Sequence, residues 1–232
     1  MMKKNILIYG YSVLGMKIAH ILHDKAYQVT IADYEEKNVI KAQEDGFNAY
    51  HLTLLNDSEL LDIKVGSGID SLFCVSGSDP NNLFVTLSAR NLDKKLKIVS
   101  IAKTRSEAKK FMMAGATKVL NPNELSALRV FRYLTKPKML EVLDEILFNK
   151  SNLQIAEIYI EKNSKLNGTF LRNLSMHKQF NILLLGIMDH EISNKFIFNT
   201  RGINHKIDEG DILVIVGDTH KIEKFKESLE KN

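Results

Sequence analysis

The sequence predicts an α/β fold, in which a doubly wound parallel sheet is followed by a helical hairpin and a small α+β domain. Three observations lead to this prediction. Through the first half of the chain, short apolar stretches of strand length alternate with segments that have the periodicity of amphipathic helices. Two consecutive helical segments then interrupt this alternation. The last third is rich in strand-like segments and closes with a helix, an order typical of α+β domains.

The first 122 residues contain six strand candidates separated by helix candidates. The first strand, NILIY, has apolar residues on both faces, as expected inside a parallel sheet. We predict strands at 5–9, 28–32, 47–52, 69–77, 97–102 and 117–122, and helices at 13–24, 39–46, 57–66 (with Asp57 as N-cap), 83–93 and 104–115. Connections this short place the strands parallel, with helices on both faces of the sheet. Residues 1–122 are therefore expected to form a Rossmann-like domain.

The next segment is predicted to be a crossover and dimerisation hairpin over residues 123–150. Its helices are expected at 123–135 and 137–148, and Pro137 suits the first turn of the second helix. They carry more apolar residues than one sheet face needs, so we predict that they pack against a second copy of the chain. The remaining residues, 151–232, form the α+β domain, with strands at 154–160, 181–189, 195–199 and 210–218, a turn with a short helix at 166–175, and a final helix at 219–231.

Composition excludes several classes of protein. The net charge of +4 is small and spread along the chain, so no nucleic-acid partner is expected. A single cysteine, Cys74, rules out a disulfide within the chain and fits a reducing cytoplasm. The longest apolar run, at 181–188, is far shorter than the roughly 20 residues of a membrane span. We therefore expect a soluble, cytoplasmic chain.

The segment GYSVLG at 10–15 predicts a phosphate-binding loop between the first strand and the first helix. Gly10 and Gly15 hold the outer positions of the pattern G-x-G-x-x-G, and Ser12 stands at the middle glycine position. Asp33 follows the second strand at about the distance of the acid that binds ribose hydroxyls. This pattern favours an adenine nucleotide (ATP, ADP or an NAD-type dinucleotide). In the alternative, the two glycines serve only the tight turn and close packing, and the Ser12 hydroxyl fills the space of a phosphate.

The sequence also contains residues that could form other sites. Asp33 and Glu35 offer carboxylates that can bind Ca²⁺ or another divalent cation, although ribose binding by Asp33 is favoured. The seven histidines form no metal-spaced set with cysteine or carboxylates, and His20 and His23 are expected to flank a packed helix face. Asp208, Glu209 and Asp211 read as a polar turn before the last strand. With no Tyr-x-x-x-Lys pair, G-x-S-x-G turn or G-x-x-x-x-G-K-[ST] loop, the sequence indicates that the protein is not an enzyme.

The whole pattern resembles the RCK (regulator of potassium conductance) domain, also described as a TrkA N-terminal and C-terminal domain pair. The segments that carry the resemblance are NILIYGYSVLG, VTIADYEE, DSLFCVSGSDPNNLFVTLSARNLDKKLKIVSIA and EAKKFMMAGATKVLNPNEL in the first part. LNGTFLRNLSMHKQFNILLLGIMD and GDILVIVGD carry it in the second part. Together they span nearly the entire chain, and their order and spacing are more specific than any one of them.

The resemblance implies a set of ligand-binding residues. Gly10, Tyr11, Ser12 and Gly15 would form the phosphate loop and Asp33 would hold the ribose. At the carboxyl edge of the sheet the remaining candidates are Ser76, Asp79, Asn82 and Lys103, with Glu124 at the start of the crossover helix. Glu124 would either reach the nucleotide of a partner copy or pair with the dipole of its own helix.

The resemblance also implies a regulator rather than an enzyme. Such domains dimerise through the crossover hairpin and assemble into octameric rings below a potassium pore, which places the chain at the inner face of the cell membrane. The degenerate glycine loop looks more like the channel branch of the family than the soluble TrkA/KtrA branch. The alternatives are a separate TrkA/KtrA-type subunit of a potassium uptake transporter, a structural ring whose loop binds nothing, and a small NAD(P)-dependent oxidoreductase.

Overall fold

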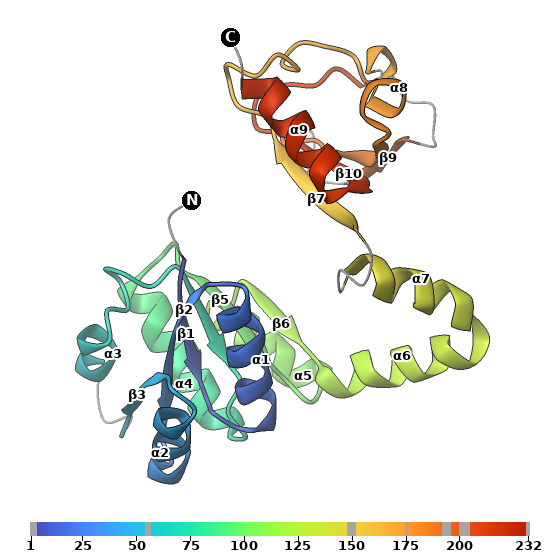
Figure 1. Cartoon of the computed structure of the whole chain (residues 1–232). Coiled ribbons are helices and arrows are strands. Elements are labelled where there is room, and N and C mark those ends of the chain that lie inside the picture. The colour runs from blue at the N-terminus through green and yellow to red at the C-terminus, as the bar shows by residue number, and fades with distance from the viewer. Residues whose placement is uncertain are drawn as a thin grey trace. The chain divides into compact units, whose positions relative to one another are not determined.

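A computed structural model describes residues 4–53, 57–147, 152–174, 176–191, 196–199 and 205–230 (Figure 1). The chain divides into two compact units, residues 1–130 and 131–232, and each is described by itself. Residues 1–3, 54–56, 148–151, 175, 192–195, 200–204 and 231–232 lie outside the described part, as do four ends of predicted elements, at 148, 175, 195 and 231. None of the helices that the structure describes is long and apolar enough to span a bilayer.

The N-terminal unit is built on a six-stranded parallel sheet, which confirms the predicted doubly wound fold. Its strands are β1 (Asn5–Tyr9), β2 (Gln28–Asp33), β3 (Asn48–His51), β4 (Ser71–Cys74), β5 (Lys97–Ile101) and β6 (Lys118–Leu120). They lie in the order β3-β2-β1-β4-β5-β6, and every neighbouring pair is parallel. The strand order reverses between β1 and β4, and ligands of such sheets bind outside the carboxyl ends of the strands at this point.

Helices cover both faces of this sheet. They are α1 (Val13–Asp24), α2 (Glu36–Glu44), α3 (Ser58–Asp62), α4 (Asp79–Leu92) and α5 (Arg105–Met113). Successive side chains of β1 point to opposite faces, as the period of a strand requires. Leu7 and Tyr9 pack with residues of α3 and α4, whereas Ile6 and Ile8 pack with residues of α1 and α2.

Helices α2 and α4 begin earlier than the sequence predicts, and α2 begins at Glu36 rather than at residue 39. Helix α4 begins at Asp79, four residues early, because Ser78 caps it by accepting a 3.4 Å hydrogen bond from the Asn81 amide, and Pro80 suits the first turn. Asp57 stands at the N-cap of α3, but its side chain makes no capping hydrogen bond. Residues 79–82, which lie between the predicted strand at 69–77 and the predicted helix at 83–93, are therefore the first turn of α4.

Helix α6 (Pro122–Thr135) is continuous across residue 130, where the two units divide, and α7 (Pro137–Leu147) follows it. No residue of α6 is buried. Phe131 and Leu134 are 61% and 77% exposed. In α7, Leu140 is buried. Helix α6 therefore exposes apolar side chains. The sequence predicts that such side chains pack against a second copy of the chain.

The C-terminal unit contains a four-stranded antiparallel sheet, in agreement with the predicted α+β class. Its strands are β7 (Leu153–Tyr159), β8 (Leu183–Met188), β9 (Phe196–Phe198) and β10 (Ile212–Asp218), in the order β7-β10-β8-β9. Helix α9 (Thr219–Glu230) supplies Ile222 and Phe225 to a core that also contains Ile187 and Leu213. A 3₁₀ turn (Leu171–Asn173) and a short helix, α8 (Met176–Phe180), complete the unit, and α8 was not predicted.

Candidate functional site

The turn from β1 into α1 requires both outer glycines for steric reasons. Gly10 has a φ of +105°, and a Cβ on it would lie 2.3 Å from the backbone nitrogen of Ser76. A Cβ on Gly15 would lie 1.8 Å from the carbonyl oxygen of Gly10. Both distances are far below van der Waals contact, so these glycines are needed for the fold whether or not the loop binds a ligand.

Ser12 occupies the space that a middle glycine would leave open. It is half-buried at the N-cap of α1, where its side chain makes no capping bond. Instead, its hydroxyl donates a 3.2 Å hydrogen bond to the carbonyl oxygen of Val75, just after β4. The hydroxyl therefore fills space and ties the loop to the neighbouring strand end. The next residue, Val13, is 68% exposed, so the start of the helix remains accessible to an anion.

Asp33 anchors the glycine loop from the end of β2. Its carboxylate is buried and accepts hydrogen bonds from the Tyr11 amide (2.6 Å), the Glu35 amide (2.8 Å) and the Asn38 side chain (3.1 Å). A carboxylate has about four lone-pair sites, so three donors leave it limited capacity for a ribose hydroxyl. Tyr11 is buried as well, and its hydroxyl lies 2.7 Å from Asp45 Oδ2. Burial and this acceptor both raise the pKa of Tyr11.

Ser76 and Asn82 hold each other in the turn between β4 and α4. The Ser76 amide and hydroxyl both donate to Asn82 Oδ1, at 3.0 and 2.7 Å, and Asn82 Nδ2 donates to the Ser76 carbonyl at 3.0 Å. Asn82 is fully buried, so its amide stabilises the turn behind Gly10 and is not open to a ligand. Asp79 is half-buried in the first turn of α4.

Tyr9 is a residue of this sheet edge that the sequence analysis missed. It is the last residue of β1 and has no exposed surface, and its hydroxyl makes no hydrogen bond of normal geometry with the described residues, although Asn81 is near. Burial, with Asp33 adding to it, raises the pKa of this phenol. A buried hydroxyl without a partner is the kind of group that a water molecule or ligand satisfies. Its only sequence signal is a polar tip in an apolar strand directly before Gly10.

The last two candidates lie at the far side of the sheet, after β5 and β6. Lys103 is exposed, and its backbone amide donates to Glu107 while its carbonyl accepts from Asn121. Glu124 lies in the first turn of α6, with an exposed 3.9 Å ion pair to Arg105, a type of contact that contributes little stability. The structure thus groups Gly10, Tyr11, Ser12, Gly15, Asp33, Ser76 and Asn82, and leaves Lys103 and Glu124 apart from them.

The proposed divalent-cation residues, Asp33 and Glu35, do not converge on one point. Glu35 is exposed and lies 3.5 Å from Lys37, while Asp33 accepts from backbone and amide donors. His20 and His23 both pack edge-on against Phe47, as expected. The sequence spacing indicates no histidine–carboxylate set, but the structure brings His205 close to two aspartates that are distant from it or unmarked in the sequence pattern.

One cavity of the N-terminal unit lies away from the glycine loop. It has a volume of about 680 Å³ and is lined by α5 and β6 residues, among them Ala108, Lys109, Met112 and Val119. None of the glycine-loop residues lines it, and the candidate nucleotide site remains at the carboxyl edge of β1 and β2.

Comparison with known proteins gives the context for this geometry. Residues 6–122 match the TrkA-N domain and residues 155–230 match the TrkA-C domain. The chain belongs to the family of TrkA-N and TrkA-C domain proteins. The two domains account for the parallel sheet and the antiparallel sheet, respectively.

Three similar proteins illustrate the family. Potassium channel protein 1 of Methanocaldococcus jannaschii is 25% identical over 232 residues, which are 99% of this chain and 68% of the relative. A structure of the GsuK channel bound to NAD has a TM-score of 0.50 at 16% identity, covering 99% of this chain and 40% of that one. The human SLO3 gating ring has a TM-score of 0.70 at 11% identity, covering 95% and 46%. The chain spans less than half of these two solved chains, and at such identities they establish the fold alone.

Proposed function

We propose that this chain is the ligand-sensing gating domain of a potassium channel, placed at the cytoplasmic face of the pore. The observation that carries the proposal is the match to both TrkA domains in a chain that aligns, over 99% of its length, with a relative named as a potassium channel protein. The likeness of the fold to the human SLO3 gating ring supports it. In this function the chain changes the state of a pore and performs no chemical step.

The proposed ligand is an adenine nucleotide at the carboxyl edge of β1 and β2. The first turn of α1 contains no acidic residue and its first residue, Val13, is exposed, so backbone amides and the helix dipole favour a phosphate there. A structure of the GsuK channel contains NAD, which supports this class of ligand. The side chain of Ser12 leaves less space for a phosphate at the loop. We therefore expect weaker nucleotide binding than with glycine at this position.

Gating requires that the ligand bind one state of the assembly more tightly than the other. A ligand shifts an equilibrium only by its difference in affinity for the two states. We propose that the second copy binds through the exposed apolar side chains of α6, which include Leu128, Phe131 and Leu134, and that pairs of chains form a ring. Helix α6 directly follows β6, a strand of the sheet whose carboxyl edge carries the proposed nucleotide site.

The first test is thermal unfolding of the purified chain with ATP, ADP, AMP, NAD and NADH in separate samples. A ligand at 100 times its dissociation constant stabilises by about 2.7 kcal/mol, which raises Tm by roughly 5–10 °C in a chain of this size. The informative variant is Val13→Glu, because an acid at an exposed helix start is compatible with folding but repels a phosphate. Ile21→Glu adds the same charge to an exposed position near the other end of α1 and serves as control.

We expect an adenine nucleotide to stabilise the wild type and Ile21→Glu but not Val13→Glu. If Val13→Glu is stabilised as much as the wild type, the nucleotide binds elsewhere and the proposed site is wrong. If no nucleotide stabilises the wild type, the loop has only its structural role. Steady oxidation of NADH in the same samples would indicate an oxidoreductase and contradict the gating proposal.

A further inference from the structure

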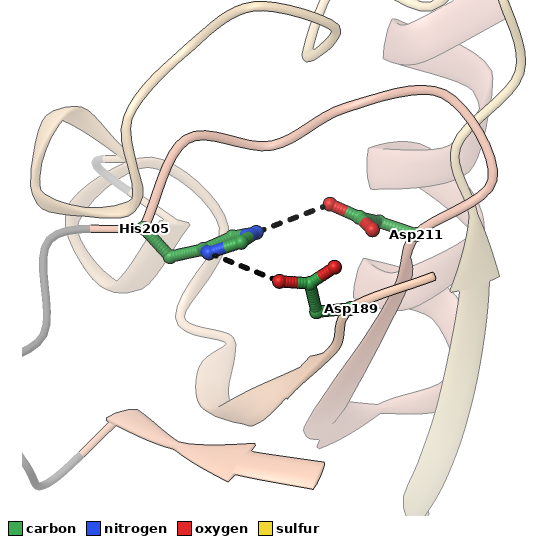
Figure 2. Close-up of side chains that lie close together, drawn as sticks. All are labelled: Asp189, His205 and Asp211. Atoms are coloured by element: carbon green, nitrogen blue, oxygen red, sulfur yellow. Dashed lines mark hydrogen bonds and ion pairs between the residues drawn. The ribbon is translucent and has the colours of Figure 1, made fainter. Parts of the chain in front are cut away.

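The C-terminal unit brings together three side chains that are typical metal ligands (Figure 2). Asp189 directly follows β8, Asp211 directly precedes β10, and His205 comes from the segment between them. The imidazole lies between the two carboxylates, with Nε2 3.3 Å from Asp211 Oδ2 and Nδ1 3.7 Å from Asp189 Oδ2. Because β8 and β10 are neighbours in the sheet, strand pairing brings these ends together.

The two carboxylates are buried and fixed in orientation by backbone amides. Asp189 and Asp211 are only 2% and 1% exposed. Asp211 accepts from the amides of His190 (3.0 Å) and Asp208 (2.9 Å), and the amide of Glu191 donates to Asp189 Oδ1 (2.8 Å). Such outer hydrogen bonds are the usual means by which metal-binding carboxylates are oriented.

The backbone of His205 is fixed independently of its side chain. Its carbonyl accepts a 2.9 Å hydrogen bond from the Leu171 amide, and the adjacent Lys206 forms an antiparallel bridge with Phe170. Only 13% of the His205 side chain is exposed. The imidazole therefore reaches the carboxylates from a backbone that is already held in place.

The negative charge of the two buried carboxylates favours a cation beside them. Buried charges are normally compensated by pairing or by a metal ion. A divalent ion bound to one ring nitrogen and both carboxylates balances two negative charges with two positive ones.

The distances fit a small divalent ion. One donor atom from each of the three residues lies within 4.8 Å of the others. Ligand atoms about 2.0–2.2 Å from a tetrahedral Zn²⁺ lie roughly 3.3–3.6 Å from one another. Nε2 lies 3.3 Å from Asp211 Oδ2, whereas the 3.7 Å contact of Asp189 is to the other ring nitrogen, so a bound ion would draw Asp189 and one nitrogen closer together. The nitrogen donor favours Zn²⁺ over Ca²⁺ and Mg²⁺, which take oxygen ligands.

We propose that Asp189, His205 and Asp211 bind one divalent transition-metal ion of the Zn²⁺ type, with a water molecule as further ligand. The ion fastens the segment around residue 205 to the ends of β8 and β10, and its binding changes the stability of the C-terminal unit. This site is separate from the nucleotide loop and does not depend on the proposed gating function.

The test uses the 232-residue chain after treatment with EDTA and dialysis. Zn²⁺ is titrated by calorimetry, Tm is followed with and without Zn²⁺, and Co²⁺ serves as a spectroscopic substitute whose visible absorption reports tetrahedral coordination. His205→Gln removes the nitrogen ligand while keeping a polar side chain. His220→Gln is the matched control, because His220 is exposed and 4.0 Å from a carboxylate, that of Glu223, on the surface of the same unit.

We expect one Zn²⁺ per chain, a rise in Tm of roughly 5–10 °C at saturation, and at least a tenfold loss of affinity in His205→Gln but not in His220→Gln. Equal affinity in both variants overturns the proposal, as does the absence of Zn²⁺ binding to the wild type. Stabilisation by Ca²⁺ but not Zn²⁺ overturns the assignment of a transition metal. If His205→Gln does not fold, the ¹⁵N resonances of the wild-type His205 ring decide: no change with Zn²⁺ overturns the site.

Discussion

The close approach of Gly15 to Gly10 predicts the outcome of Gly15→Ala, for which two physical effects have opposite signs. Gly15 lies inside α1, and in a helix interior alanine is favoured over glycine by about 1 kcal/mol. The new Cβ would, however, lie 1.8 Å from the Gly10 carbonyl oxygen and 3.4 Å from a Val75 methyl group. The sign of the change in the free energy of unfolding therefore shows whether helix propensity or packing dominates at this turn.

The structure indicates that packing dominates. The distance between the new Cβ and the Gly10 carbonyl oxygen must increase from 1.8 Å to at least 3.0 Å. Neither atom can move that far without a shift of the backbone. Forcing a methyl group into a packed site typically costs 1–3 kcal/mol, and more when backbone must move. A cost of about 3 kcal/mol, less about 1 kcal/mol of propensity, gives a net loss of about 2 kcal/mol in the free energy of unfolding.

Cys74 provides an assay that reports the N-terminal unit alone. It is the single cysteine of the chain and lies fully buried in β4, and burial raises the pKa of its thiol to about 12. A short pulse of thiol reagent across a urea series therefore labels only molecules whose N-terminal unit is open. The matched control is Gly77→Ala, because a Cβ at Gly77 meets nothing within 4 Å. We expect this control to be neutral or to stabilise by about 0.4–1 kcal/mol.

A midpoint of Cys74 labelling in Gly15→Ala at or above that of the wild type would refute the reasoning. It would mean that α1 moves away from the turn at little cost in free energy and that packing does not require a glycine at position 15. A loss of similar size in Gly77→Ala would show that the effect is not specific to the turn.

Three further predictions concern other parts of the chain. Asn82→Ala leaves the Ser76 amide and carbonyl without their partner and should lower the free energy of unfolding by about 2–4 kcal/mol in the same labelling assay; a loss under about 1 kcal/mol would contradict the network. The raised pKa of Cys74 means that the native state holds its proton between pH 9 and about 12 while the unfolded state loses it. Stability should therefore fall with rising pH in this window, by up to about 1.4 kcal/mol per pH unit, relative to Cys74→Ala measured by circular dichroism, and parallel curves would contradict this. Phe131→Glu should convert a dimer to a monomer in light scattering, and a monomeric wild type would contradict the role of α6.

Local patterns account for most of what could be predicted in the N-terminal unit. β1 and α1 were placed correctly because the apolar run, the glycine and the helical periodicity all lie within 20 residues. The start of α4 was missed because it depends on a capping bond from Ser78 rather than on apolar spacing. Helix α8 is one short turn with few apolar residues, and propensity alone does not identify such a segment.

The candidate sites show where sequence reasoning reaches its limit. The glycine loop is a contiguous motif, but the occupation of Asp33 by three donors depends on residues from two different elements. Asp189, His205 and Asp211 match no ligand spacing in the sequence, because pairing of β10 with β8 brings them together. Asp211 is predicted to belong to a polar turn, and its backbone does. The prediction does not include its side chain, which accepts hydrogen bonds from two backbone amides.

The geometry of the first turn also changes what a glycine signature can tell a reader of other sequences. Gly10 is held by the backbone of Ser76 and Gly15 by the carbonyl of Gly10, so a chain that lost its nucleotide would still have to retain both. The turn itself requires the outer glycines, so their presence does not distinguish a loop that binds a nucleotide from one that does not. Information about the ligand resides instead in the residue at the middle position, Ser12, and in the exposed residue at the helix start, Val13.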